Sequence, residues 1–265
     1  MRPTSASKSL VENPEQSRVG MSIIEDLLSG LKLSGPVHDV RIGPHWTSVA
    51  VSTAAGLRGG IAGTAALEHH CRGQPCVREA GTLLGRDALT LAQLARSDSG
   101  VERSVGLATI NALLNVDQAT CVEVNAGDII VKHGAGKQVA IVGHFPFVHR
   151  VRQAAGALWV LELRPLGEDL PASRAADVIP QADVVGITGS TLLNQTFEGL
   201  LSLCQPSAYI VVMGGSTPLS PLFFDHGVNA VAGAQVVDVD AVLRAVSQGA
   251  TFRQIPGKRL LTMYG

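Results

Sequence analysis

The sequence predicts an α/β protein in two parts: a small N-terminal α+β domain and a C-terminal Rossmann-like domain with a doubly wound, mainly parallel sheet. From about residue 139 onward, short apolar runs alternate with helical patterns, as strands and helices do in such a sheet. Before that point, three strand-like segments come first and helices follow them, which is typical of an α+β domain. The composition agrees with two packed domains, because 46% of the 265 residues are hydrophobic and only 16% are charged.

The N-terminal part starts with residues 1–18, which carry no apolar region of the kind found in a secretory signal. We interpret them as a disordered tail. The segment 37–52 alternates apolar and polar residues across a Gly-Pro turn, as an antiparallel hairpin does. We expect the small domain to span residues 19–120, with a helix over 19–32, the hairpin over 37–52, a third strand over 57–65, and helices over 85–97 and 100–115.

The C-terminal domain, which we expect over residues 121–265, contains five short runs that are apolar throughout. A parallel sheet covered by helices on both faces requires strands of this kind. The runs lie at 139–143, 158–163, 183–189, 208–215 and 229–238. Helical patterns separate or follow them at 146–155, 172–180, 190–204, 218–226 and 240–249.

Polar residues follow four of the predicted strands, where an open parallel sheet binds its ligands. The first strand leads into Gly143 and His144, and the second ends at Glu162. Gly-Ser-Thr occurs twice, each time between a buried strand and a helix, and hydroxyls there either cap the helix or bind an anion. Two such sites on neighbouring strands favour a polar ligand pocket, and its candidate residues are Thr188, Gly189, Ser190, Thr191, Asn194, Gly214, Gly215, Ser216 and Thr217.

Three further features each have two interpretations. Glu162 is either a structural acid bonded to backbone amides or a metal ligand, ribose binder or general base. Ser104, Ala108, Asn111 and Asn115 form one line on the helix 100–115, which either packs with hydrogen-bonded amides or lines a cleft. The segment 67–76 holds His69, His70, Cys71 and Cys76, which are metal-binding residue types, but no second Cys/His pair completes a four-ligand zinc site.

Several function classes are disfavoured. No dinucleotide fingerprint follows the first strand and the phosphate-loop spacing is absent, so we expect no routine use of NAD or ATP. No Gly-x-Ser-x-Gly elbow of a hydrolase is present. A net charge of −1 without a basic run indicates no nucleic-acid partner, and no apolar stretch is long enough to span a bilayer. Four cysteines do not form a disulfide framework, which predicts a cytoplasmic location.

Five segments together resemble a known family, the heavy-metal chelation family. They are SVGLATINALLN (104–115), VAIVGHF (139–145), VLELRP (160–165), ADVVGITGSTLLNQTFEGLL (182–201) and VVMGGSTPLSPLFFDHGVNAVAGAQVVD (211–238). The resemblance covers roughly residues 100–255 and implies a Rossmann-like C-terminal domain with an N-terminal domain similar to that of enolase. One departure is visible: the family usually has Gly-Pro before its second Ser-Thr, whereas this chain has Gly214-Gly215, and we expect that change to loosen the loop.

The resemblance implies a protein that binds a metal ion, or a small metal complex, in a cleft between its domains. By matching motif, the cleft would use Asn111, Gly143, Glu162, Thr188, Gly189, Thr191, Asn194, Gly214, Ser216 and Thr217. We expect a divalent transition metal as cofactor, with Glu162 and His144 as first candidate ligands and His69, His70, Cys71 and Cys76 as second ones. The alternative is an enzyme acting on a small anionic or nucleotide-like substrate. Whether the protein turns over a substrate, and whether it forms a homo-oligomer, the sequence leaves open.

Overall fold

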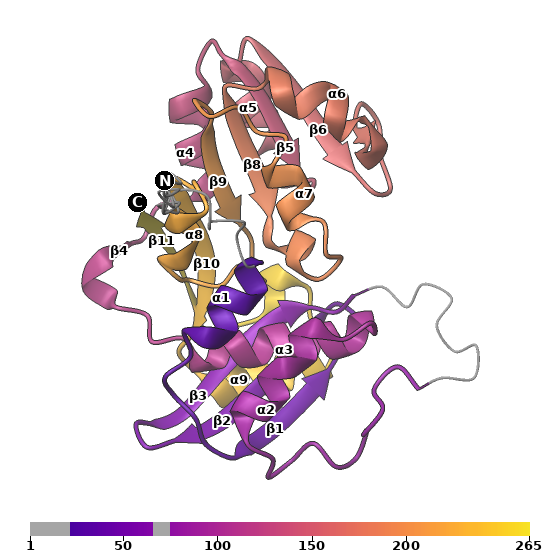
Figure 1. The fold of residues 1–265 in the computed structure, drawn as a ribbon, viewed down its shortest axis with the longest axis vertical. Coiled ribbons are helices and arrows are strands. Elements are labelled where there is room, and N and C mark those ends of the chain that lie inside the picture. The colour runs from indigo at the N-terminus through magenta and orange to yellow at the C-terminus, as the bar shows by residue number, and fades with distance from the viewer. Residues whose placement is uncertain (1–21, 66–74) are drawn as a thin grey trace, which may run out of the picture.

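The computed structural model describes residues 22–65 and 75–265 and confirms the two-part α/β fold (Figure 1). An eight-stranded, mainly parallel sheet forms one part, and a three-stranded antiparallel sheet forms the other. The predicted tail 1–18 lies outside the described residues. None of the helices within the described ranges is long and apolar enough to cross a membrane.

The large sheet contains β4 (Cys121–Val122), β5 (Gln138–Val142), β6 (Ala157–Glu162), β7 (Leu170–Pro171), β8 (Val184–Thr188), β9 (Tyr209–Met213), β10 (Ala230–Val236) and β11 (Lys258–Tyr264). Their order is β4-β11-β10-β9-β8-β5-β6-β7. The strands from β10 to β7 pair in parallel, whereas β11 pairs antiparallel with β10 and with β4. The chain passes from β5 to β6 on one side and returns to β8 on the other, so the topological switch point lies between β5 and β8.

Helices cover both faces of the large sheet, as the apolar strands predict. Val139 and Ile141 of β5 pack with one set of helices, α4 (Ala126–Gly134) and α5 (Val148–Ala154). Ala140 and Val142 face the opposite side, in the core that includes α6 (Ala175–Val178), α7 (Phe197–Leu201) and α8 (Leu222–Asp225). This alternation along β5 follows from the two-residue period of a strand, and it explains why both kinds of position are apolar.

The small sheet contains β1 (Val37–Ile42), β2 (Trp46–Thr53) and β3 (Gly56–Gly63). One face packs against α3 (Gly100–Leu113), and α2 (Ala88–Ala92) packs against α3 in the same core. The other face packs against α9 (Val239–Ser247), a helix that comes after β10 and crosses from the large sheet to the small one (Figure 1). The remaining helix, α1 (Ile23–Ser29), packs against α8. The domain boundary at residue 120 stays a prediction. Helix α9 belongs to the C-terminal part of the chain but packs against the small sheet of the N-terminal part.

Some predicted elements differ in the structure. The predicted helix 190–204 is wrong as a continuous element: a 3-10 turn at Gly189–Leu192 precedes α7, and Gln195 has a φ of 60° between them. Asn194 accepts hydrogen bonds from the backbone N–H and the hydroxyl of Thr196, and such local bonds compete with a helix. The predicted helix 218–226 shrinks to α8, because Pro218 and Pro221 interrupt it. The sequence analysis did not predict α4 or β11.

Candidate functional site

The chain makes a close turn at the switch point. Gly143, directly after β5, has a φ of 102°, a region of backbone space that favours glycine. A Cβ at this position would lie 3.1 Å from the side chain of Thr188, the last residue of β8. The turn therefore passes tightly beside the end of the neighbouring strand, and it carries His144 to the edge of the sheet.

Two carboxylates fix the position of His144. Its backbone N–H donates to Oε1 of Glu162 at 2.6 Å, and the N–H of Leu163 donates to the other oxygen at 3.1 Å. The imidazole Nδ1 lies 2.9 Å from the carboxylate of Asp169, whose side chain is only 3% exposed. A carboxylate in this position favours the neutral tautomer that carries its proton on Nδ1 and its lone pair on Nε2. The half-exposed ring therefore offers Nε2 to a ligand.

A cleft of about 890 Å³ opens beyond the carboxyl ends of β5, β8 and β9. Trp46 of β2 forms part of its wall, and so do residues of β10 and β11, so both sheets contribute to it. A second cavity, of about 360 Å³, lies beyond the ends of β5, β6 and β8. The two cavities share His144, Phe145, Thr188 and Ser190.

The larger cleft is lined by basic side chains and by no acidic side chain of the described residues. Arg150, Arg253 and Lys258 line it, and no Asp, Glu or Cys does among the described residues. Asp128 pairs with Arg150 at 2.6 Å, but within the described part of the chain no carboxylate forms an ion pair with Arg253 or Lys258. The ammonium of Lys258 donates to the carbonyl of Ile255 and lies 4.7 Å from the ring centroid of Phe252. Burial lowers the pKa of Lys258, and an anion beside it would oppose that effect.

Two aromatic pairs also line the larger cleft. Phe145 and Phe147 are stacked with ring centroids 5.2 Å apart. Trp46 and Phe252 form a tilted pair with centroids 4.9 Å apart, and these two rings join the small sheet to the segment before β11. These side chains give part of the cleft wall an apolar surface of the kind found in sites for organic ligands.

The structure brings together most of the residues that the sequence analysis proposed. The smaller cavity is lined by Gly143, His144, Glu162, Thr188, Ser190, Thr191 and Asn194. The larger cleft is lined by His144, Thr188, Ser190, Gly214, Gly215 and Ser216. These side chains come from four strand ends, and they lie close together because the carboxyl ends of parallel strands meet at one edge.

Gly189, Thr217 and Asn111 lie behind this surface. A Cβ on Gly189 would be 2.4 Å from Oγ1 of Thr217, so these two loops pack directly on each other. The amide of Asn111 donates to the carbonyls of Ile61 and Ser216, at 2.8 and 3.2 Å, and thereby links α3 to the loop after β9. In the same line, Ser104 and Ala108 are fully buried, as the packed interpretation expects, whereas Asn111 lines a cavity of about 160 Å³ and Asn115 is exposed.

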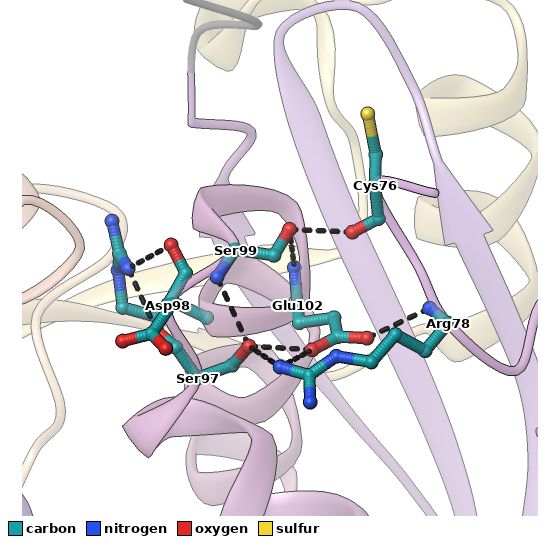
Figure 2. Close-up of polar contacts among 7 residues, drawn as sticks. Cys76, Arg78, Ser97, Asp98, Ser99 and Glu102 are labelled. Atoms are coloured by element: carbon teal, nitrogen blue, oxygen red, sulfur yellow. Dashed lines mark hydrogen bonds and ion pairs between the residues drawn. The ribbon is translucent and has the colours of Figure 1, made fainter. Parts of the chain in front are cut away.

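The base of the His/Cys segment is tied to the start of α3 (Figure 2). His69, His70 and Cys71 lie outside the described residues, whereas Cys76 is described. The carbonyl of Cys76 accepts a hydrogen bond from Ser99 Oγ at 2.5 Å, and the sulfur points away from that contact (Figure 2). Cys76 lines neither of the two cavities.

The described residues offer few donors for a bare metal ion. In the ranges 22–65 and 75–265, no group of three or more His, Cys, Asp and Glu side chains is placed to hold one. Burial raises the pKa of the Cys204 thiol to about 11 and also raises that of Cys121, so both favour the protonated thiol. Glu162 already accepts two backbone N–H groups. Among the described residues that line the cleft, His144 has a ring nitrogen, Nε2, without a hydrogen-bond partner.

The loop after β9 is held by close packing. A Cβ on Gly215 would lie 2.4 Å from the ring of Phe252 and 2.7 Å from that of Trp46. We expected Gly214-Gly215 to loosen this loop, but the structure shows a closely packed loop. Because residue 215 has no side chain, the rings of Trp46 and Phe252 pack directly against its backbone.

Gly215→Ala should destabilise the protein by about 1–3 kcal/mol, because the new methyl group must displace two packed rings. Gly199→Ala is the matched control, since Gly199 has no neighbour within 4 Å of a Cβ and lies in α7. This control should be neutral or more stable by about 0.5–1 kcal/mol. Urea unfolding of both variants measures the difference. Equal stabilities would contradict the packing described for Gly215.

Sequence reasoning missed the cations and rings of the cleft. Arg253, Phe252 and Lys258 lie after the last predicted helix, and Trp46 lies in the small domain. Asp169 follows His144 by 25 residues and belongs to no motif. The one available signal was the pair of phenylalanines in the strand-end segment GHFPF, which the switch-point rule places at the site.

Comparisons with known proteins show the family and the fold of the chain. Residues 125–264 match a family model described as "Putative heavy-metal chelation", and residues 13–114 match a second model with the same description. A solved protein with unknown function from Desulfitobacterium hafniense DCB-2, of the family of the first model, has a TM-score of 0.77 and 24% identity and covers 92% of this chain and 98% of its own. A similar one from Pyrococcus horikoshii has a TM-score of 0.76, 21% identity, and coverages of 91% and 98%. These two likenesses show the fold.

A curated relative adds sequence similarity. An uncharacterised protein of Methanocaldococcus jannaschii is 30% identical over 164 residues, which are 57% of this chain and 61% of that protein. The chain thus matches less than two thirds of the relative's length. The first family model alone covers more than half of this chain.

Proposed function

Because the chain belongs to the heavy-metal chelation family, we propose that its cleft binds a metal as a small anionic complex, in which an organic chelator supplies most of the metal's ligands. The metal is the bound cargo here. The proposal differs from a metal site built only of protein side chains, and the charge of the cleft is the reason for that choice.

The observation that carries the proposal is the charge of the cleft. Arg253 and Lys258 line it without a carboxylate partner among the described residues, and Arg150 adds a third cation. Cations in this arrangement repel a bare divalent ion and attract an anion. A chelator with several carboxylates gives a metal complex the negative charge that these side chains favour.

The walls of the cleft support a compact organic ligand. A volume of about 890 Å³ accommodates a molecule of small-molecule or cofactor size. The two aromatic pairs supply flat apolar surface, and the loops after β8 and β9 supply hydroxyl and backbone groups. A bound metal complex would thus contact apolar, polar and cationic groups together.

A second candidate is an enzyme that acts on a small anionic or nucleotide-like substrate. The observation that favours it is the pair of His144 and Asp169, at 2.9 Å, beside the same cleft. An imidazole oriented by a buried carboxylate is suited to accept or donate a proton. The two candidates share the anionic ligand and differ in whether a reaction follows binding.

We expect no nucleic acid among the partners of the protein, and we retain the cytoplasm as the predicted compartment. Both rest on the sequence, from the small net charge and the use of cysteine. A homo-oligomer is compatible with the sequence.

A thermal-shift screen tests the ligand class. The panel contains Ni(II), Co(II), Zn(II) and Cu(II) as free ions, the same ions as anionic chelates, and nucleotides, pterins and amino-acid metabolites. A true ligand at 100 times its dissociation constant should stabilise the protein by about 2.7 kcal/mol. We expect anionic compounds to stabilise and free ions to have little effect. No response to any anion would count against both candidates.

A further inference from the structure

We propose that Nε2 of His144 is a protein ligand to the metal of the bound complex, filling a coordination position that the chelator leaves open. This inference rests on the proposed function and goes beyond it, because it names the atom that touches the metal. Arg253 and Lys258 would attract the complex by its charge, and His144 would recognise the metal itself.

The first step is the orientation of the ring. Asp169 lies 2.9 and 3.1 Å from Nδ1 with its two oxygens, and its side chain is almost fully buried. An ionised carboxylate only accepts hydrogen bonds, so the neutral ring carries its proton on Nδ1 and its lone pair on Nε2. The same carboxylate–histidine arrangement orients metal-binding imidazoles and makes them better donors. The ring of His144 is therefore prepared for a metal on the side away from Asp169.

The second step is the position of the ring. The backbone N–H of His144 is held by Glu162 at 2.6 Å, directly after the tight turn at Gly143. The imidazole is half exposed and lines both the larger cleft and the smaller cavity. A hydrogen-bond partner for Nε2 does not occur in the described part of the chain. With half of the ring exposed, Nε2 is therefore accessible to a ligand.

The third step is the number of donors. A transition metal takes four to six ligands, and the described residues place no group of three candidate side chains around any point. One imidazole cannot hold a divalent ion firmly by itself. It can complete the coordination of a metal whose other ligands come from a chelator, and that requirement fits the cationic cleft.

Two chelates separate the contribution of charge from that of ligation. The Ni(II) complex of ethylenediaminetetraacetate is doubly negative and leaves no coordination position open. The Ni(II) complex of nitrilotriacetate is singly negative and leaves positions open to an imidazole. Calorimetry with untagged protein measures both affinities for the wild type, for His144→Gln and for His149→Gln. His149, an exposed residue of α5, is the control, because it lines neither of these two cavities and its Nδ1 lies 2.9 Å from the carbonyl of Pro146.

We expect His144→Gln to weaken the nitrilotriacetate complex by more than about tenfold and to leave the ethylenediaminetetraacetate complex unchanged. Asp169→Asn should weaken the first complex roughly tenfold by misorienting the ring. His149→Gln should change neither. Unchanged binding of the ethylenediaminetetraacetate complex also shows that each variant is folded.

Spectroscopy of Cu(II)–nitrilotriacetate supplies a direct readout. Electron spin echo modulation from the remote nitrogen of an imidazole should appear with the wild type, vanish with His144→Gln and persist with His149→Gln. Modulation that survives His144→Gln, or is absent from the wild type, would overturn the assignment of His144 while the cationic cleft stands. Failure of both nickel chelates to bind the wild type would overturn the proposed function and this inference together.

Discussion

Replacing Arg253 and Lys258 together by glutamine should lower the affinity of the cleft for a small dianion by about 30-fold to several-hundred-fold. Each charge-assisted contact contributes roughly 1.5–3 kcal/mol, and glutamine keeps part of it as a neutral hydrogen bond, so the loss of both charges should cost about 2–4 kcal/mol. Glutamine keeps most of each side chain's length and can still donate a hydrogen bond, so the loss reports the charge. The measurement is calorimetric titration with the Ni(II)–ethylenediaminetetraacetate complex.

The control for this double variant removes the same charge elsewhere. Arg244 and Lys32 are exposed and line neither cavity, so their replacement by glutamine changes the net charge equally. This control should weaken binding less than about threefold at physiological salt, because solvent and salt screen exposed charges that do not line the cleft. A control that weakens binding as much as the double variant would mean that the cleft cations have no local role.

Glu102→Ala should reduce the free energy of unfolding by roughly 2–5 kcal/mol, since it strips an acceptor from several donors. The Glu102 side chain is 3% exposed and accepts from the backbone N–H of Arg78 at 2.8 Å and from Ser97 Oγ at 2.5 Å (Figure 2). The guanidinium of Arg78 lies 3.3 Å from it. Chemical denaturation measures the change, and Glu102→Gln should give a smaller loss because one oxygen remains.

Glu79→Ala is the matched control for Glu102. Its side chain is 56% exposed and pairs with Arg86, so its removal should cost less than about 1 kcal/mol. If the two alanine variants were equally stable, the hydrogen bonds of Glu102 to Arg78 and Ser97 would not anchor the segment around Arg78 to α3.

The strands of the large sheet were predictable because burial on both faces requires a continuous run of apolar residues in the sequence. Positions such as Val139 and Ala140 face opposite helical layers, so neither alternate position can be polar. β11 leaves a weaker trace: Arg259, Leu260 and Tyr264 are exposed, and the strand lies near the edge of the sheet. Its pattern is mixed, and only the tertiary structure pairs it with β10.

The strand-end residues were predictable for a topological reason, whereas the rest of the site was not. Thr188 is the last residue of a parallel strand, Gly143 and Gly214 follow two others, and such strands end at one edge. Lys258 and Trp46 reach the same cleft from opposite ends of the chain, and no spacing in the sequence reports that approach. The buried state of Asp169 and its contact with His144 likewise depend on how the loop after β6 folds back.

The helix predicted over 190–204 shows the limit of periodicity. Its leucines and Phe197 do lie on the apolar side, and Phe197 is fully buried against Phe223. The hydroxyls and the amide between Thr188 and Thr196 instead bond to nearby backbone, which divides the helix. That division leaves Ser190 and Asn194 at the cavity wall.

The most direct test compares the binding of free Ni(II), a cation, with the binding of Ni(II) in anionic complexes. Wild-type protein is titrated in a calorimeter with free Ni(II) and, separately, with the Ni(II) complexes of citrate, nitrilotriacetate and ethylenediaminetetraacetate. We expect at least one anionic complex to bind about 100-fold or more tightly than the free ion, a difference of about 2.7 kcal/mol, and its affinity to fall as salt is added. Free Ni(II) binding as tightly as every complex, with no dependence on Arg253 and Lys258, would contradict the proposal that the cleft recognises an anionic metal complex.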